Sequence, residues 1–150
     1  MSTANFSDLD FNDVFAKDVS HITTIDVKNI FNEPILDLIE VSYVNLTTLI
    51  VSNCKLQSLD IDSHYTLCDR KFPNLKHADF SCNELTHLPE SIANWSSLEI
   101  LDLHDNKFDE LPYAIMQLKL KKIIIHGNPL RSLDPVIKQF IDGVNSLNCP

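Results

Sequence analysis

A repeated spacing of leucines, clearest at residues 98–108, most constrains what this chain can fold into. The segment LEILDLHDNKF fits the pattern L-x-x-L-x-L-x-x-N-x-L, with phenylalanine at the last apolar position. The same pattern begins at Leu46, Leu75, Leu98 and Leu120. Because one such unit cannot bury its own hydrophobic face, the pattern predicts that successive units stack into a solenoid.

The asparagine position of the pattern sets the register of the units. It is occupied by Cys54, Asn83, Asn106 and Asn128, and a weaker unit that begins at Ile22 has isoleucine there. The intervals between these positions are 24, 29, 23 and 22 residues. These values fall within the roughly 20–29 residues of one known class of repeat, so that about five units are predicted.

Residues around the fourth and sixth positions of each unit are expected to form a short strand, because their side chains alternate between inside and outside. Inward apolar side chains then stack from unit to unit, and the strands pair in parallel along one concave face. The three asparagines are predicted to turn inward and to bond backbone groups that the following loop leaves unpaired. Such a group, if buried without a partner, costs about 1–3 kcal/mol.

Two units continue with the pattern Leu-Pro-x-x-Ile-x-x-Leu, at residues 88–95 and 111–118, although Trp95 replaces the last leucine of the first. Together with the repeat, these segments resemble the leucine-rich-repeat family, and in particular an intracellular subclass whose members often scaffold small GTPases, kinases or phosphatases. The resemblance implies an α/β solenoid, a short horseshoe with parallel concave strands that is capped by N- and C-terminal helices. It also implies protein binding without enzymatic activity, and it leaves the partner open.

The chain divides into three parts on this basis. Residues 1–21 are predicted to be an N-terminal cap with a helix near 7–17, residues 22–134 to hold the repeats, and residues 135–150 to form a C-terminal capping helix and tail. The first full unit carries extra residues at 63–72, which are predicted to bulge on the convex side or the rim. Trp95 is predicted to fill the core in place of leucine.

The C-terminal helix is predicted to run from Pro135 to Gly143, with Asp134 as its N-cap. Proline fits the first turn of a helix, and glycine commonly follows the last one. The side chains expected to cover the last repeat are Val136, Ile137, Phe140 and Ile141.

Charge argues against duplex nucleic acid as a direct partner, because the net charge is −9 and phosphate binding needs a basic face. Five of the 12 basic residues but only two acidic residues lie in 119–150, which gives +3 there and −12 in the rest of the chain. The first ten residues are polar and acidic, and no apolar run approaches the ~20 residues that span a bilayer. We therefore expect no membrane association and an intracellular, cytoplasmic location, with the nucleus as the alternative.

The four cysteines are Cys54, Cys68, Cys82 and Cys149, and they form neither a C-x-x-C motif nor a zinc-type His/Cys cluster in the sequence. A structural metal is therefore not expected, and free thiols at these positions fit a reducing compartment. No glycine-rich phosphate loop or nucleophile elbow is present either. We expect no enzyme, no cofactor, and neither catalytic nor metal-binding residues.

The variable positions of the strands are the candidates for partner binding, because the repeat leaves them free to differ. The predicted contact residues of the concave face are Ile50, His77, Asp79, Ile100, Asp102, His104, Lys122, Ile124 and His126. Strands about 4.8 Å apart would make Asp79 a neighbour of Asp102, and His104 a neighbour of His126. A metal site or acid–base catalysis at this His/Asp patch is less favoured than protein contact, because an open groove neither fixes ligand geometry nor excludes water. Exposed isoleucines such as Ile50 and Ile124 favour burial by a partner.

Two functional hypotheses follow. In the first, the protein is an interaction module or scaffold that binds a protein partner through the concave face, with regulation of a signalling enzyme as one version of this role. In the second, it is a dedicated subunit of a large assembly, such as a ribonucleoprotein, that docks through its basic C-terminal end. In both cases we expect a monomer or a subunit of a hetero-complex.

Overall fold

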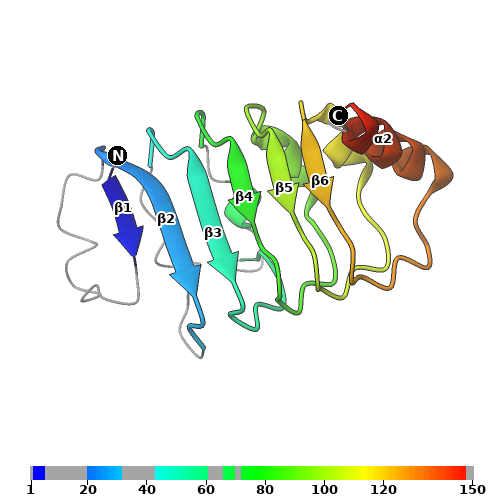
Figure 1. The fold of residues 1–150 in the computed structure, drawn as a ribbon, viewed down its shortest axis with the longest axis horizontal. Helices are drawn as coiled ribbons and strands as arrows, with labels where there is room; N and C mark the ends of the chain where they lie inside the picture. The colour runs from blue at the N-terminus through cyan, green and yellow to red at the C-terminus, as the bar shows by residue number, and fades with distance from the viewer. Residues whose placement is uncertain (1, 6–19, 32–42, 61–65, 70–71, 148–150) are drawn as a thin grey trace.

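The computed structural model describes residues 2–5, 20–31, 43–60, 66–69 and 72–147. Six parallel strands lie side by side in chain order and form one sheet (Figure 1). They are β1 (Ser2–Asn5), β2 (Ile22–Lys28), β3 (Thr48–Ser52), β4 (His77–Asp79), β5 (Ile100–Asp102) and β6 (Lys122–Ile124). Strands β2 to β6 fall at the expected positions of the five repeat units, which confirms the predicted solenoid.

Strand β1 was not predicted, because it lacks the repeat pattern. It pairs in parallel with β2 and thereby extends the sheet by one strand at the N-terminal end. The register between the two shifts at Ser2 and Thr3. The helix predicted near residues 7–17 lies outside the described residues.

Among the described residues, the convex side of the solenoid carries the short 3₁₀ helices η2 (Leu67–Asp69), η3 (Glu90–Asn94) and η4 (Tyr113–Gln117). A proline precedes both η3 and η4, and each of these helices turns one isoleucine, Ile92 or Ile115, fully inward. The Leu-Pro-x-x-Ile-x-x-Leu segments therefore build the convex side.

The core lies between the sheet and the convex helices, and Trp95 is its largest fully buried side chain. Its ring centre lies 5.9 Å from that of Phe72 and 6.1 Å from that of Phe80. The prediction that Trp95 fills the core is confirmed. The extra residues of the first full unit were predicted to form a bulging loop, but three of them also contribute to the core, since Leu67, Cys68 and Phe72 are buried.

The asparagine ladder is present as predicted. The Oδ1 atom of Asn83 accepts hydrogen bonds from the backbone N–H groups of Cys54 and Leu56, and its Nδ2 group donates to the carbonyl of Val51 at 2.7 Å. Asn106 and Asn128, one and two units further along, each accept one backbone N–H of the preceding unit and donate to one of its carbonyls. Each side chain therefore ties its own loop to the preceding unit.

The C-terminal helix α2 (Pro135–Ser146) caps the sheet beyond β6, as Figure 1 shows. Asp134 is its N-cap, as predicted, and accepts a hydrogen bond from the N–H group of Val136. The prediction that the helix ends at Gly143 is wrong, because Val144 lies on the same buried face as Ile137 and Ile141. Burial of one more apolar side chain outweighs the roughly 1 kcal/mol that glycine costs within a helix. Val136 does not cover the last repeat, since 51% of it is exposed.

Candidate functional site

The sheet register places the predicted contact residues in two rows that cross the strands. Thr24, Thr48, His77, Ile100 and Lys122 are successive partners in the first row. Asp26, Ile50, Asp79, Asp102 and Ile124 are successive partners in the second. The expected adjacency of Asp79 and Asp102 is thereby confirmed.

His104 and His126 lie just beyond the ends of β5 and β6. Their ring centres are 4.9 Å apart and the rings are tilted by 30°, so these two side chains are also neighbours as predicted. His126 is exposed, whereas His104 is half-buried. All nine predicted contact residues therefore lie on one side of the sheet or at its strand ends.

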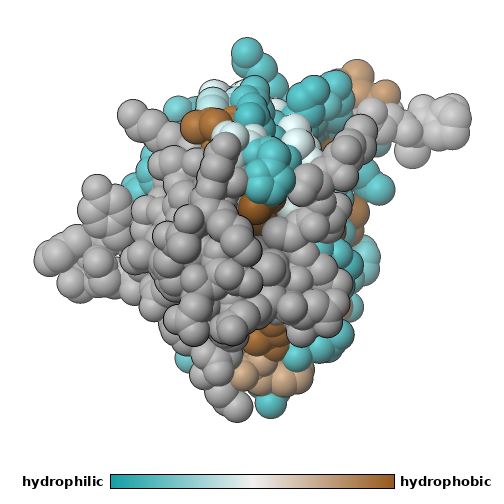
Figure 2. Space-filling model, turned by 90° about the vertical axis from the view of Figure 1, so that its left-hand side faces the viewer, coloured by the Kyte–Doolittle hydropathy of each residue, from teal (hydrophilic) through white to brown (hydrophobic). Residues whose placement is uncertain are grey.

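The three isoleucines among them, Ile50, Ile100 and Ile124, are half-buried rather than fully exposed. Neighbouring strands about 4.8 Å apart cover part of each side chain. The aliphatic surface open to a partner is consequently smaller than the strand pattern alone predicts. Viewed from the end of the sheet that carries β1, Figure 2 shows mainly hydrophilic residues among those described, with hydrophobic ones in small, separate patches.

An open pocket of about 700 Å³ lies beside β6, at the C-terminal end of the sheet. Its walls include Lys122, Ile124 and His126 from the predicted set, together with Ile125 and Leu130. Asn145 of α2 also lines this pocket and accepts a hydrogen bond from the backbone N–H of Ile123. The last strand therefore combines aliphatic and basic groups in one concavity.

Two aspartates of the second row, Asp79 and Asp102, fix the chain where their strands end. Asp79 Oδ1 accepts the backbone N–H of Ser81 at 2.9 Å, and Asp102 Oδ1 accepts that of His104 at 3.1 Å. Asp102 Oδ1 also lies 2.6 Å from Nδ1 of His104. The hydrogen bond to Asp102 raises the pKa of His104, whereas desolvation by burial lowers it. The nearby charges of Asp102, Asp105 and Asp79 also raise this pKa.

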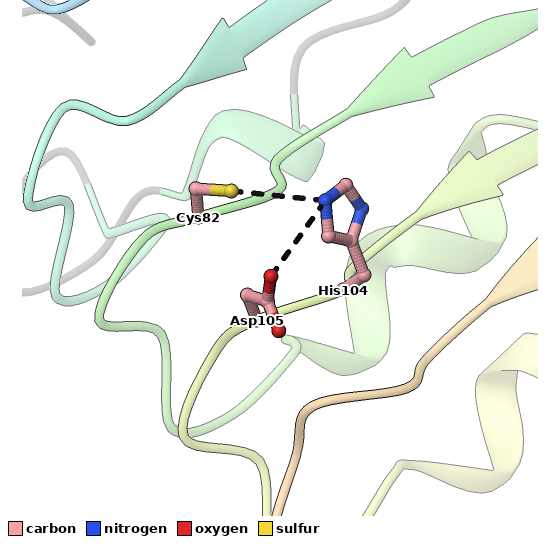
Figure 3. Close-up of side chains that lie close together, drawn as sticks. All are labelled: Cys82, His104 and Asp105. Atoms are coloured by element: carbon pink, nitrogen blue, oxygen red, sulfur yellow. Dashed lines mark hydrogen bonds and ion pairs between the residues drawn. The ribbon is translucent and has the colours of Figure 1, made fainter.

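After each of the strands β2 to β6, the residue just before the ladder position adopts a left-handed backbone conformation. These residues are Asn29, Asn53, Cys82, Asp105 and Gly127, with φ between 53° and 74°. Asparagine, aspartate and glycine favour this region, whereas cysteine does not. Because of this turn, side chains of successive units point toward one another. Figure 3 shows that the side chains of Cys82 and Asp105 both lie next to the imidazole of His104.

Cys82 and Asp105 were not predicted as site residues. Both stand at the same position of consecutive units, and stacking brings such positions side by side. That shared position is the signal by which the sequence alone points to their proximity. Their side-chain distances depend on the turn geometry, which the repeat pattern does not specify.

The family model for the leucine rich repeat matches residues 44–108 and 73–130, which together make up more than half of the chain. The chain belongs to the leucine-rich-repeat family. The family supports a protein-interaction module as the general role of this chain. A solved structure, that of the LRR protein LIC12759 from Leptospira interrogans, is similar in fold, with a TM-score of 0.53 and 24% identity. That match covers 77% of this chain and 30% of the other.

Two curated proteins are similar to parts of the chain, and both are the transforming growth factor beta activator LRRC32. The protein from Pongo abelii is 33% identical over 92 residues, which are 57% of this chain and 12% of the relative. The one from Mus musculus is 38% identical over 65 residues, which are 39% of this chain and 9% of the relative. The chain thus spans about a tenth of the length of these relatives.

The prediction of an intracellular, cytoplasmic or nuclear location is contradicted by these relatives, which act on a growth factor according to their names. The error has a physical cause. The leucine, asparagine and proline positions specify how the units pack, and this packing is the same in any aqueous compartment. The repeat pattern therefore does not indicate where in or outside the cell the protein is located. None of the described helices is long and apolar enough to cross a membrane.

Proposed function

We propose that this protein is a non-enzymatic interaction module that binds a protein partner through the concave face, defined here as the two rows of side chains on β2–β6 together with His104 and His126. The observation that carries the proposal is the combination of half-buried isoleucines and aspartates along the second row, where Asp79 and Asp102 lie between Ile50 and Ile124. Aliphatic contacts supply affinity when they are buried, and flanking charges select the partner.

The charge of the face favours a partner that presents basic and aliphatic side chains. Asp79 and Asp102 lie next to each other at the centre of the second row, and the whole chain carries a net charge of −9. Opposite charge on a partner would relieve the repulsion between these two carboxylates. That two relatives are activators of a growth factor supports a folded protein as the partner.

Affinity purification from the native source, followed by mass spectrometry, tests the concave face directly. The variant Ile50→Glu/Ile124→Glu places two charges on the second row without removing any hydrogen bond described there. Its matched control is Met116→Glu/Val136→Glu, which makes the same kind of change at exposed positions of η4 and α2. Both proteins should keep the circular dichroism spectrum of the parent chain.

We expect the partner to be retained by the parent chain and by the control, and to be lost from the concave-face variant. Retention of every partner by a folded concave-face variant would contradict the proposal. Docking through the basic C-terminal end predicts instead that Lys119→Glu/Lys138→Glu releases the partner while the concave-face variant keeps it. Lys121 is less suitable for this second variant, because its ammonium group lies 2.7 Å from the carboxylate of Glu99 and its replacement would also remove that ion pair.

A further inference from the structure

Three side chains that bind metals well converge beside the strand ends of β4 and β5 (Figure 3). Cys82 Sγ lies 3.7 Å from Nε2 of His104, and a carboxylate oxygen of Asp105 lies 4.0 Å from the same nitrogen. One ligand atom of each residue lies within 4.8 Å of those of the other two. Thiolate, imidazole and carboxylate are therefore already gathered around one point.

The spacing is close to that of a tetrahedral zinc site. Zinc bonds of about 2.3 Å to sulfur, about 2.0–2.1 Å to nitrogen and about 2.0–2.2 Å to oxygen place neighbouring ligand atoms roughly 3.4–3.6 Å apart. The Sγ–Nε2 separation of 3.7 Å is close to these values, the separation of 4.0 Å between Nε2 and the carboxylate oxygen exceeds them by about half an ångström, and Sγ lies within 4.8 Å of the carboxylate oxygen. Small side-chain rotations of Cys82 and Asp105 would close that difference, since both are exposed.

Asp102 orients the imidazole for this role. Its carboxylate lies 2.6 Å from Nδ1 of His104, so that Nδ1 carries the proton and Nε2 keeps its lone pair. Nε2 is the atom that faces Cys82 and Asp105. A carboxylate behind a metal-binding histidine is the usual means of fixing both tautomer and ring orientation.

The backbone holds the two units in place around the cluster. The N–H group of Cys82 donates to the carbonyl of His104 at 2.9 Å, and that of Asp105 donates to the carbonyl of His126 at 2.9 Å. Cys82 keeps a left-handed conformation with φ of 55°, where the neighbouring unit has Asn53. Both loops are therefore fixed before any ligand arrives.

We propose that Cys82, His104 and Asp105 bind one divalent transition-metal ion of zinc type, with Asp102 as the positioning residue behind the histidine. A thiolate with imidazole and carboxylate suits a borderline-soft cation better than magnesium or calcium. His126, whose ring centre is 4.9 Å from that of His104, or a water molecule completes the coordination. The site differs from the sequence-based expectation of no metal, because its ligands come from two consecutive units rather than from a short cysteine motif.

Cobalt(II) is the probe for the first experiment, since thiolate ligation gives it a charge-transfer absorption in the near ultraviolet. The 150-residue chain is reduced, freed of metal with a chelator and then titrated with cobalt(II) and with zinc(II). We expect one cobalt per chain with the charge-transfer band, displacement of cobalt by zinc, and a higher melting temperature with zinc. Absence of the band at millimolar cobalt would overturn the proposal.

Variants assign the ligands. Cys82→Asn gives this position the residue type found at Asn53, so it should fold at least as well and lose the charge-transfer band. Asp105→Asn should weaken zinc binding at least tenfold, and Asp102→Asn by roughly 10- to 100-fold through loss of the positioning contact. Cys149→Ser and His21→Asn serve as controls and should leave the charge-transfer band and the zinc affinity unchanged. A band that survives in Cys82→Asn would show that the thiolate ligand is another cysteine and would overturn the assignment.

Alkylation gives a readout that does not depend on metal spectroscopy. Among the described cysteines Cys82 is exposed, whereas Cys54 and Cys68 are buried. Peptide mapping after iodoacetamide treatment should show that zinc slows alkylation of Cys82 and that magnesium does not. Equal alkylation rates with and without zinc would contradict coordination by this thiol.

Discussion

Each ladder asparagine satisfies backbone groups in two units at once. Asn106 accepts the N–H of Leu85 at 3.0 Å and donates to the carbonyls of Phe80 at 2.9 Å and Leu103 at 3.1 Å. It is itself buried, with 6% of its surface exposed. No other polar side chain of this size presents one acceptor and two donors in that arrangement, so the position tolerates little change.

Replacement of Asn106 by alanine should therefore be costly. We expect Asn106→Ala to lower the free energy of unfolding by about 2–4 kcal/mol, because several buried backbone groups lose their partners together. Urea denaturation followed by circular dichroism measures the change. Asn94→Ala is the control and should cost less than about 1 kcal/mol, since Asn94 is exposed and its side chain bonds to the carbonyl of Cys68 at 3.3 Å. Equal losses for the two variants would contradict the ladder interpretation.

His104 should make stability depend on pH in the metal-free protein. Because the hydrogen bond to Asp102 raises the pKa of His104 in the folded state, protonation favours folding. This contribution is fully present below the ordinary histidine pKa and is lost as the pH rises through the higher folded-state value. The stability advantage of the parent chain over His104→Asn should thus be larger at about pH 5.5 than at about pH 8.5. Denaturation with a chelator present tests this, and an advantage that is the same at both pH values would refute it.

At the scale of single elements, the start of α2 depends on a pair of side chains from different segments. The Tyr113 hydroxyl of η4 donates to Asp134 at 2.6 Å, while Asp134 also caps the helix through the N–H of Val136. Both hydrogen bonds lower the pKa of Asp134, the one from Tyr113 more strongly. The convex layer and the C-terminal cap are therefore joined at this aspartate.

Loss of this contact should weaken the cap in a pH-dependent way. We expect Tyr113→Phe to lower the melting temperature at neutral pH and to reduce amide protection in the first turn of α2. Since the folded-state pKa of Asp134 is depressed, its contribution is present above the ordinary value of 3.8 and disappears as the pH falls through the folded-state pKa. Thermal melts of both proteins across this range check the prediction, and a constant difference down to the lowest pH would rule it out.

At the scale of the whole molecule, each repeat of a solenoid contacts the repeats next to it. A destabilising substitution in a central repeat should therefore affect more of the array than one at an end. Trp95 packs against Phe72 and Phe80 in the central units, whereas Ile141 is buried on the terminal helix α2, which packs against β6. We expect Trp95→Ala to cost about 3–5 kcal/mol and to lower protection throughout the array. Ile141→Ala should chiefly open α2 and β6 and leave β3 and β4 protected. Hydrogen exchange with mass spectrometry distinguishes the two patterns, and identical patterns would contradict a nearest-neighbour array.

Much of the fold follows from positions that recur along the chain. Leu98, Leu101 and Leu103 recur at a fixed spacing, and a short strand with inward side chains is the arrangement that buries them unit after unit. The asparagine position is equally predictable, because the turn after each strand leaves backbone groups that need a partner. The start of α2 is predictable for a local reason, since Asp134 and Pro135 suit a helix N-terminus whatever surrounds them.

Other features depend on contacts between units that no local pattern specifies. The helix continues past Gly143 because Val144 finds a buried site, and the extra residues of the first full unit contribute Leu67 and Phe72 to the core. The partial burial of Ile50 and Ile124 likewise depends on their neighbours across the sheet. These outcomes are set by tertiary packing energy rather than by local propensity.

The sequence by itself determined the repeat, the order of strands β2 to β6 and which of their side chains share a face, because the spacing of leucine and asparagine allows one way to bury them. Only the tertiary structure decided how closely side chains from different units approach. Cys82 meets His104 and Asp105 because a left-handed turn in each unit and the stacking of two units act together. Distances of this kind depend on three-dimensional packing, and a one-dimensional pattern does not contain them.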